Sequence, residues 1–129
     1  MFTDPELMGA AWEESVMRDI GDDLAPAELV LLDVDAECER QDGLWGDQSH
    51  LPLGTDAALI PIADEFRRVA DEAHKEGKLT WTDILSEEFY EAVSEEDPAK
   101  LEEELIQLAA VAVQMAKSIR LNRARGQVD

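Results

Sequence analysis

Acidic residues at helical spacing are the strongest chemical feature of this sequence. Glu88 and Glu91 are three residues apart, so on a helix their carboxylates lie on one face about one turn apart and can reach the same ion. Glu104 and Gln107 repeat this spacing further along the chain. If the two segments form an antiparallel helical hairpin, the pairs meet and offer three carboxylates and one amide oxygen. An all-oxygen set of this kind suits Mg²⁺, or Mn²⁺, better than Zn²⁺.

A solvated acidic surface is the alternative explanation of the same pattern. The chain has 31 Asp and Glu among its 129 residues, so some pairs at this spacing occur by chance. Glu104 and Gln107, however, are flanked by Leu101, Leu105 and Leu108, and a solvated face has no need of that apolar stripe. Composition alone does not decide between the two explanations.

The elements that must position these residues are helices. Apolar residues recur at helical spacing, and the β-branched alternation typical of strands is absent from the sequence. Helices are expected from Asp4 to about Arg18, from Ala27 to between Gly43 and Gly46, from about Ile60 to Gly77, from Thr80 or Thr82 to about Val93, and from Pro98 onward.

The last of these segments predicts a long helix with one apolar stripe. Its apolar positions alternate by four and three, as in helices that pack together: Leu101, Leu105, Leu108, Ala112, Met115 and Ile119. Trp81 is expected in the core. We therefore predict an all-α helical bundle over residues 26–125, preceded by an acidic arm over 1–25 and followed by a short tail over 126–129.

The acidic pattern resembles the signature of the MazG-like all-alpha nucleoside triphosphate pyrophosphohydrolases. That signature is Glu-Glu-x-x-Glu, a spacer, and Glu-x-x-Asp. Glu87, Glu88 and Glu91 match its first half, Glu104 opens the second, and Gln107 stands where the family has Asp. A subgroup of the family is similar both in a Trp-Gly-x-Gln loop and in a Glu-x-x-Gln helix. The resemblance covers roughly residues 27–123.

The resemblance implies a Mg²⁺-dependent enzyme that splits nucleoside or deoxynucleoside triphosphates into the monophosphate and pyrophosphate. It also implies an all-alpha fold completed by a homodimer or homotetramer. Glu88, Glu91, Glu104 and Gln107 are the expected metal ligands, and Glu87, Glu88 or Glu91 is the expected group that orients or deprotonates the attacking water. The neutral amide of Gln107 binds a hard cation more weakly than a carboxylate, so metal occupancy or activity is expected to be reduced.

Two further groups of residues are expected to contact the nucleotide, because they resemble or match regions that do so in the family. These substrate-binding candidates are Arg40, Trp45, Gln48, Lys117, Asn122 and Arg123. For Trp45 the alternative is a loop anchor packed on the bundle. For the basic residues near the C-terminus the alternative is compensation of the helix dipole, which stabilises by about 0.3 to 1 kcal/mol per cation.

Composition excludes several other classes of function. With 11 Lys and Arg against 31 Asp and Glu, the net charge of −20 disfavours nucleic acid and anionic membranes as direct partners. Cys38 is the only cysteine, and the sequence shows neither a signal peptide nor an apolar run long enough to cross a membrane, so a cytoplasmic location is expected. A phosphate-binding glycine loop and the parts of a nucleophilic triad are absent, which leaves metal-assisted hydrolysis.

Two other functions fit the same residues. One is a nucleotide-binding or sensing protein that kept the fold and lost turnover through Gln107. The other is an acidic protein-interaction module, for which the strongly acidic residues 1–25 are the best sequence feature.

Overall fold

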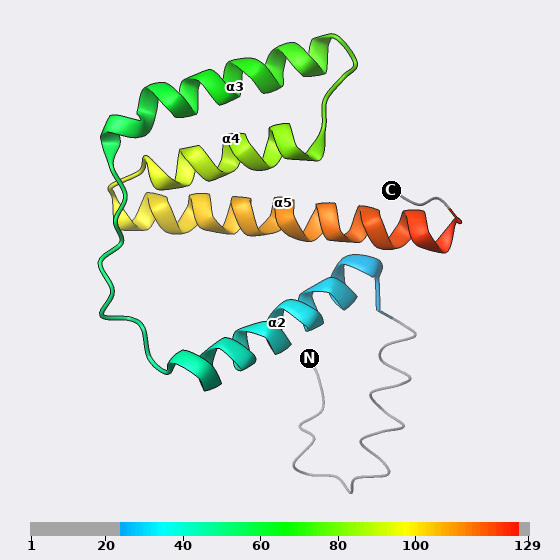
Figure 1. Ribbon diagram of the computed structural model, residues 1–129, viewed down its shortest axis with the longest axis horizontal. Coiled ribbons are helices and arrows are strands. Elements are labelled where there is room, and N and C mark those ends of the chain that lie inside the picture. The colour runs from blue at the N-terminus through cyan, green and yellow to red at the C-terminus, as the bar shows by residue number, and fades with distance from the viewer. Residues whose placement is uncertain (1–23, 127–129) are drawn as a thin grey trace, which may run out of the picture.

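The computed structural model describes residues 24–126, and every regular element in that range is helical (Figure 1). The elements are α2 (Pro26–Trp45), a short 3-10 turn (Ala57–Leu59), α3 (Ile60–Lys75), α4 (Trp81–Val93) and α5 (Pro98–Ala124). The all-α prediction is therefore confirmed for this part of the chain. The helix expected over 4–18 and most of the predicted tail lie outside the described residues.

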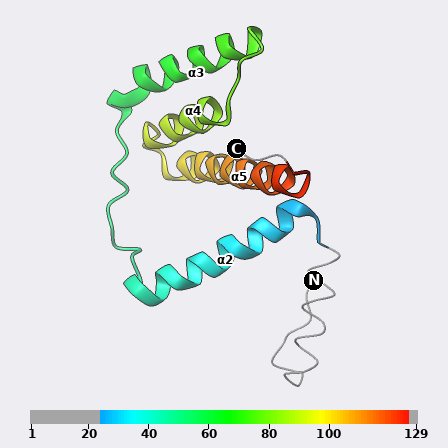
Figure 2. The same ribbon diagram turned by 45° about the vertical axis from the view of Figure 1, so that its right-hand side comes forward.

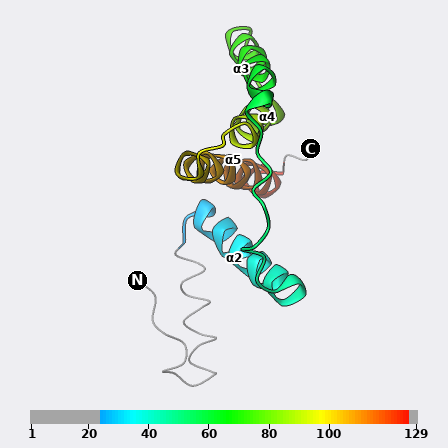
Figure 3. The ribbon, with the colours of Figure 1, turned by 90° about the vertical axis from the view of Figure 1, so that its left-hand side faces the viewer.

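The four described helices form an open row rather than a closed bundle. α3 packs on α4, α4 on α5, and α5 on α2, and this order is visible from three directions (Figures 1, 2 and 3). α3, α4 and α5 follow one another through short turns as two consecutive antiparallel hairpins. α2 reaches the opposite side of α5 through the long connection over residues 46–56.

Local signals in the sequence explain where the helices of these hairpins begin and end. Gly77 has a φ of 71°, a left-handed conformation that favours glycine, in the turn after α3. The Thr80 hydroxyl accepts a hydrogen bond from the Asp83 N–H at 3.2 Å, and the Asp83 carboxylate accepts one from the Thr80 N–H at 3.0 Å. Thr80, and not Thr82, therefore caps α4. The Asp97 carboxylate caps α5 by accepting from the Lys100 N–H at 3.0 Å.

Two hydrogen bonds hold the beginning of α3 near the turn between α4 and α5. The Asp56 N–H donates to the Val93 carbonyl at 2.9 Å, and the Ala57 N–H donates to a Glu96 carboxylate oxygen at 2.7 Å. These bonds join the segment that precedes α3 to the end of α4 and the turn between α4 and α5. They hold α3 beside the ends of the helices that carry the acidic pattern.

The core is small because a row of helices encloses little volume. Its buried apolar side chains, among the described residues, are Val30, Ala63, Ala70, Ala92, Leu101 and Val113. The predicted stripe of α5 is only partly correct, since Leu105 is 47% exposed and Ile119 is also exposed. Trp81, expected in the core, is exposed as well. Within one chain, α4 and α2 cover only part of the apolar surface of α5.

None of the described helices combines the length and the hydropathy that crossing a membrane requires.

Candidate metal centre

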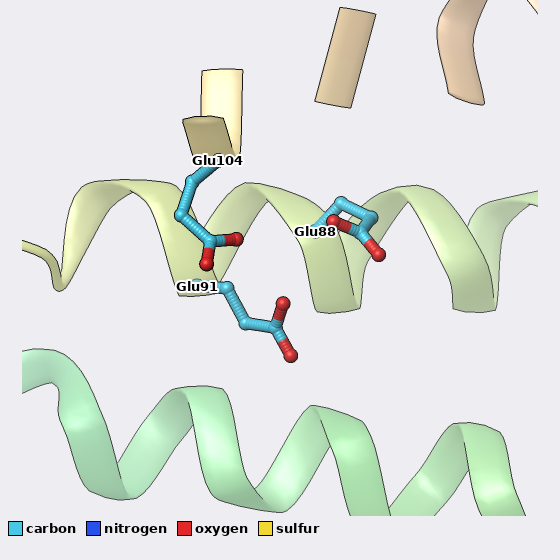
Figure 4. Close-up of side chains that lie close together, drawn as sticks. All are labelled: Glu88, Glu91 and Glu104. Carbon is cyan, nitrogen blue, oxygen red and sulfur yellow. The ribbon is translucent and has the colours of Figure 1, made fainter. Parts of the chain in front are cut away.

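Glu88, Glu91 and Glu104 converge between α4 and α5 (Figure 4). Each offers one carboxylate oxygen, and these oxygens all lie within 4.8 Å of one another. The hairpin explains the meeting, because Glu88 and Glu104 are equally distant in sequence from the centre of the turn at Glu96. Two oxygens bound to one Mg²⁺ are at most about 4.2 Å apart, so side-chain movements of roughly half an ångström complete the geometry.

The three glutamates are here called the carboxylate cluster, and two of them, Glu88 and Glu104, are held in an environment that disfavours their charge. One oxygen of Glu88 and one of Glu104 (Oε2 in each) are buried without a hydrogen-bond partner. Burial raises the pKa of Glu88, and the charges of Glu91, Glu87 and Glu104 raise it further. Burial also raises the pKa of Glu104, followed by the charge of Glu91. A cation placed among these oxygens would offset both the cost of burying the charged carboxylates and the repulsion between them.

Glu87 lies beside the carboxylate cluster and faces α3. Burial raises its pKa, as do the charges of Glu91 and Asp71, whereas Arg67 opposes this shift. Its Oε1 is 3.9 Å from Nε of Arg67. Glu87 is therefore a carboxylate close to the cluster with increased basicity.

Arg67 of α3 is a residue of this site that the sequence pattern did not reveal. Its Nη2 donates to Oε1 of Glu91 at 2.9 Å, and its Nε donates to the same oxygen at 3.3 Å. Nη1 donates to Asp64 at 3.2 Å. A signal existed, because Arg67 and Phe89 are equally distant from the centre of the turn between α3 and α4, which puts Arg67 opposite Glu87 and Glu91.

Gln107 follows Glu104 by one turn of α5, and its side chain is exposed. It is thus on the helix that the resemblance requires and near the cluster in sequence. Its role as a fourth ligand stays a prediction.

The substrate-binding candidates near the C-terminus lie far along α5 from the cluster. Lys117 comes thirteen residues after Glu104, which is about 20 Å along the helix axis, and Arg123 is about 28 Å away on the same measure. Lys117 and Asn122 are half-buried and Arg123 is exposed. Within one chain these residues are not brought to the carboxylate cluster.

The other substrate-binding candidates belong to α2 and the segment after it. Arg40 is exposed and pairs with Glu37 of its own helix, with Nη2 of Arg40 2.7 Å from Oε2 of Glu37. Trp45 ends α2 and is 65% exposed, so it is not a packed anchor within the described chain. Gln48 follows in an exposed turn. α2 packs on α5 and is separated from α3 and α4 by it, so these residues form a second group apart from the cluster (Figure 3).

Comparison with known proteins gives no match: no family model fits this chain, and neither a curated protein nor a solved structure matches it.

The raised pKa values predict that the cluster destabilises the metal-free fold at neutral pH. A carboxyl group whose folded pKa is raised favours the folded state while it is protonated, and this contribution is lost as the pH rises through the folded pKa. Glu88→Gln should therefore increase the free energy of unfolding at pH 7.5 without metal by on the order of 1 kcal/mol, or roughly 4 °C in Tm. The gain should shrink as the pH falls below the ordinary Glu value.

Thermal unfolding in EDTA between pH 4 and pH 8 measures this effect. Glu102→Gln, an exposed position on α5 outside the cluster, is the matched control and should show no comparable gain. A Glu88→Gln protein that is less stable than the wild type at pH 7.5 would contradict the prediction.

Proposed function

We propose that this protein is a MazG-like, Mg²⁺-dependent pyrophosphohydrolase that converts nucleoside or deoxynucleoside triphosphates into the monophosphate and pyrophosphate. The observation that carries the proposal is the convergence of Glu88, Glu91 and Glu104, with two buried oxygens that lack a partner. It agrees with the Glu-Glu-x-x-Glu and Glu-x-x-Gln pattern of the sequence.

The donor set fits a hard divalent cation. The three candidate ligands are carboxylates, and a group of negative charges that is partly removed from water favours a bound cation. Glu88, Glu91 and Glu104 would hold the ion, with Gln107 as the fourth oxygen donor. Mg²⁺ held there would neutralise charge that develops on the phosphate oxygens during hydrolysis.

The remaining residues have roles of their own in this proposal. Glu87 is a suitable group to orient or deprotonate the attacking water, because its raised pKa makes it a stronger base than an ordinary glutamate. Glu88 and Glu91 are the alternatives for this role. The net charge of −20 repels a free triphosphate, so a cation at the cluster is also what allows the substrate to approach.

The direct test is release of pyrophosphate from a panel of nucleoside and deoxynucleoside triphosphates, with Mg²⁺ and with EDTA. We expect release with at least one nucleotide, and only with Mg²⁺ or Mn²⁺. A panel with no release under either condition would reject the enzymatic proposal.

A nucleotide-binding protein without turnover is the second candidate, and the neutral Gln107 favours it. In that case calorimetry would detect Mg²⁺-dependent nucleotide binding while pyrophosphate release stays absent. An acidic interaction module would instead bind a basic protein partner with no need for metal.

We further propose that the open row is completed by a second copy of the chain. Large apolar side chains are exposed on each of the four described helices, including Leu31, which is 52% exposed, and Ile106. Apolar surface of this extent is typical of interfaces between subunits. Light scattering at micromolar concentration should therefore give at least twice the chain mass of 14.4 kDa.

The variant Leu31→Glu tests this assembly, because it adds charge to an apolar position that one chain leaves exposed. It should shift the mass toward the monomer without loss of helical circular dichroism. A wild-type mass of 14.4 kDa would show that the chain is a monomer.

A further inference from the structure

Arg67 is the basic residue in a small hollow beside the carboxylate cluster. The hollow has a volume of about 230 Å³, and its lining includes Arg67, Glu91, Ser94, Glu95 and Glu104. Asp64 also lines this space. Four carboxylates and one guanidinium therefore border it. Arg67 is the one positively charged side chain in this lining, and its contacts indicate what it could bind.

The hydrogen bonds of Arg67 show how it is held. Two of its nitrogens donate to one oxygen of Glu91, at 2.9 Å and 3.3 Å, and a third donates to Asp64 at 3.2 Å. The side chain is nonetheless 49% exposed. Arg67 is thus directed at the cluster by its pairing with Glu91, while about half of its side-chain surface stays exposed to solvent.

Glu91, the hydrogen-bond partner of Arg67, is also a proposed metal ligand. The strength of the ion pair between Arg67 and Glu91 should therefore depend on whether a cation is bound. Charge on Glu91 that is shared with a bound cation attracts Arg67 less strongly, because the two positive charges compete for the same carboxylate. A guanidinium has five N–H donors in a fixed planar arrangement that matches the oxygens of a phosphate group. The basic residues expected to bind phosphate from the sequence, Lys117 and Arg123, are about 20 Å or more from Glu104 along α5.

We infer that Arg67 is a phosphate-binding residue of this site, held in place by Glu91 and Asp64 until a phosphate ligand arrives with the cation. This inference rests on the proposed function. It assigns to α3 the positive charge of the hollow, whose lining includes no Lys or Arg of α4 or α5.

The test compares Arg67→Gln with Arg68→Gln by calorimetry, using Mg²⁺ alone and then inorganic pyrophosphate in saturating Mg²⁺. Arg68 is the matched control, since it is the next residue of α3 and pairs with Glu65 and Glu72, outside the cluster. We expect Arg67→Gln to bind Mg²⁺ as tightly as the wild type or more tightly, and to bind Mg²⁺-pyrophosphate at least about tenfold more weakly. Arg68→Gln should change neither affinity appreciably.

The conservative variant Arg67→Lys separates charge from geometry. It should recover only part of the pyrophosphate affinity, because one ammonium cannot place two fixed N–H groups on a phosphate. Circular dichroism confirms that each variant is folded.

Three results would overturn the inference. Weaker Mg²⁺ binding by Arg67→Gln would show that Arg67 only positions Glu91. Unchanged pyrophosphate affinity, or an equal loss in Arg68→Gln, would show that Arg67 does not contact phosphate. If the wild type binds no Mg²⁺, the proposed function itself fails and the inference fails with it, which is distinct from the other two results.

Discussion

Replacing Glu104 with Gln is expected to decrease Mg²⁺-dependent pyrophosphate release by more than tenfold. The substitution removes one of three charged ligands and hardly changes the volume of the side chain. A tenfold decrease corresponds to about 1.4 kcal/mol in the activation barrier, a small loss for a ligand of the ion that stabilises the transition state. Initial rates at saturating nucleotide, with Mg²⁺ varied, measure the effect.

Glu102→Gln is the control for this experiment, because it removes a charge from the same helix at an exposed position outside the cluster. It should keep nearly the full rate. Glu91→Gln is expected to lose activity as well, but Glu91 also accepts hydrogen bonds from Arg67, so Glu104 is the cleaner position. Retention of more than about a tenth of the rate by a folded Glu104→Gln protein would show that Glu104 is not a ligand.

Replacing Gln107 with Asp is the second change with a large expected effect. An amide offers one oxygen without charge, whereas Asp adds a full negative charge one turn from Glu104. Mg²⁺ should therefore bind more tightly, by roughly tenfold, through Coulomb attraction. Calorimetric titration of both proteins with Mg²⁺ measures this difference.

The rate of the same variant separates two roles for Gln107. If Gln107 is only a weak ligand, Gln107→Asp should release pyrophosphate faster. If its NH₂ group donates to a phosphate oxygen, the variant should bind metal more tightly yet turn over more slowly, because a carboxylate cannot donate. Unchanged Mg²⁺ affinity would show that residue 107 does not face the ion.

Features of the site that depend on local sequence could be predicted, and those that depend on long-range packing could not. The spacing along each helix, together with the turn from Glu95 to Pro98, was enough to predict that Glu88, Glu91 and Glu104 meet. The Thr80 and Asp97 caps are equally local signals. Arg67 was missed because an arginine three residues after Asp64 is typical of an ordinary surface ion pair, and its contact with Glu91 requires the pairing of α3 with α4.

The least predictable feature was the extent of the core. Apolar periodicity shows that a helix has an apolar face, but it does not show which molecule covers that face. Leu105 follows the expected stripe of α5 and is nevertheless exposed in the single chain. Trp45 and Gln48 were expected to contact the nucleotide because of the family resemblance, whereas within one chain they belong to α2 and the segment after it, apart from the cluster.

The open row also predicts an order of folding. α3, α4 and α5 contact their immediate neighbours in sequence through short turns, and contacts of this local kind form quickly because little chain entropy is lost in closing them. α2 differs, since it contacts α5 across the rest of the chain, as in the ion pair between Asp33 and Arg120, 87 residues apart. We therefore expect the two hairpins that carry the carboxylate cluster and Arg67 to form before α2 docks, so the residues of the site would come together without the slowest contact.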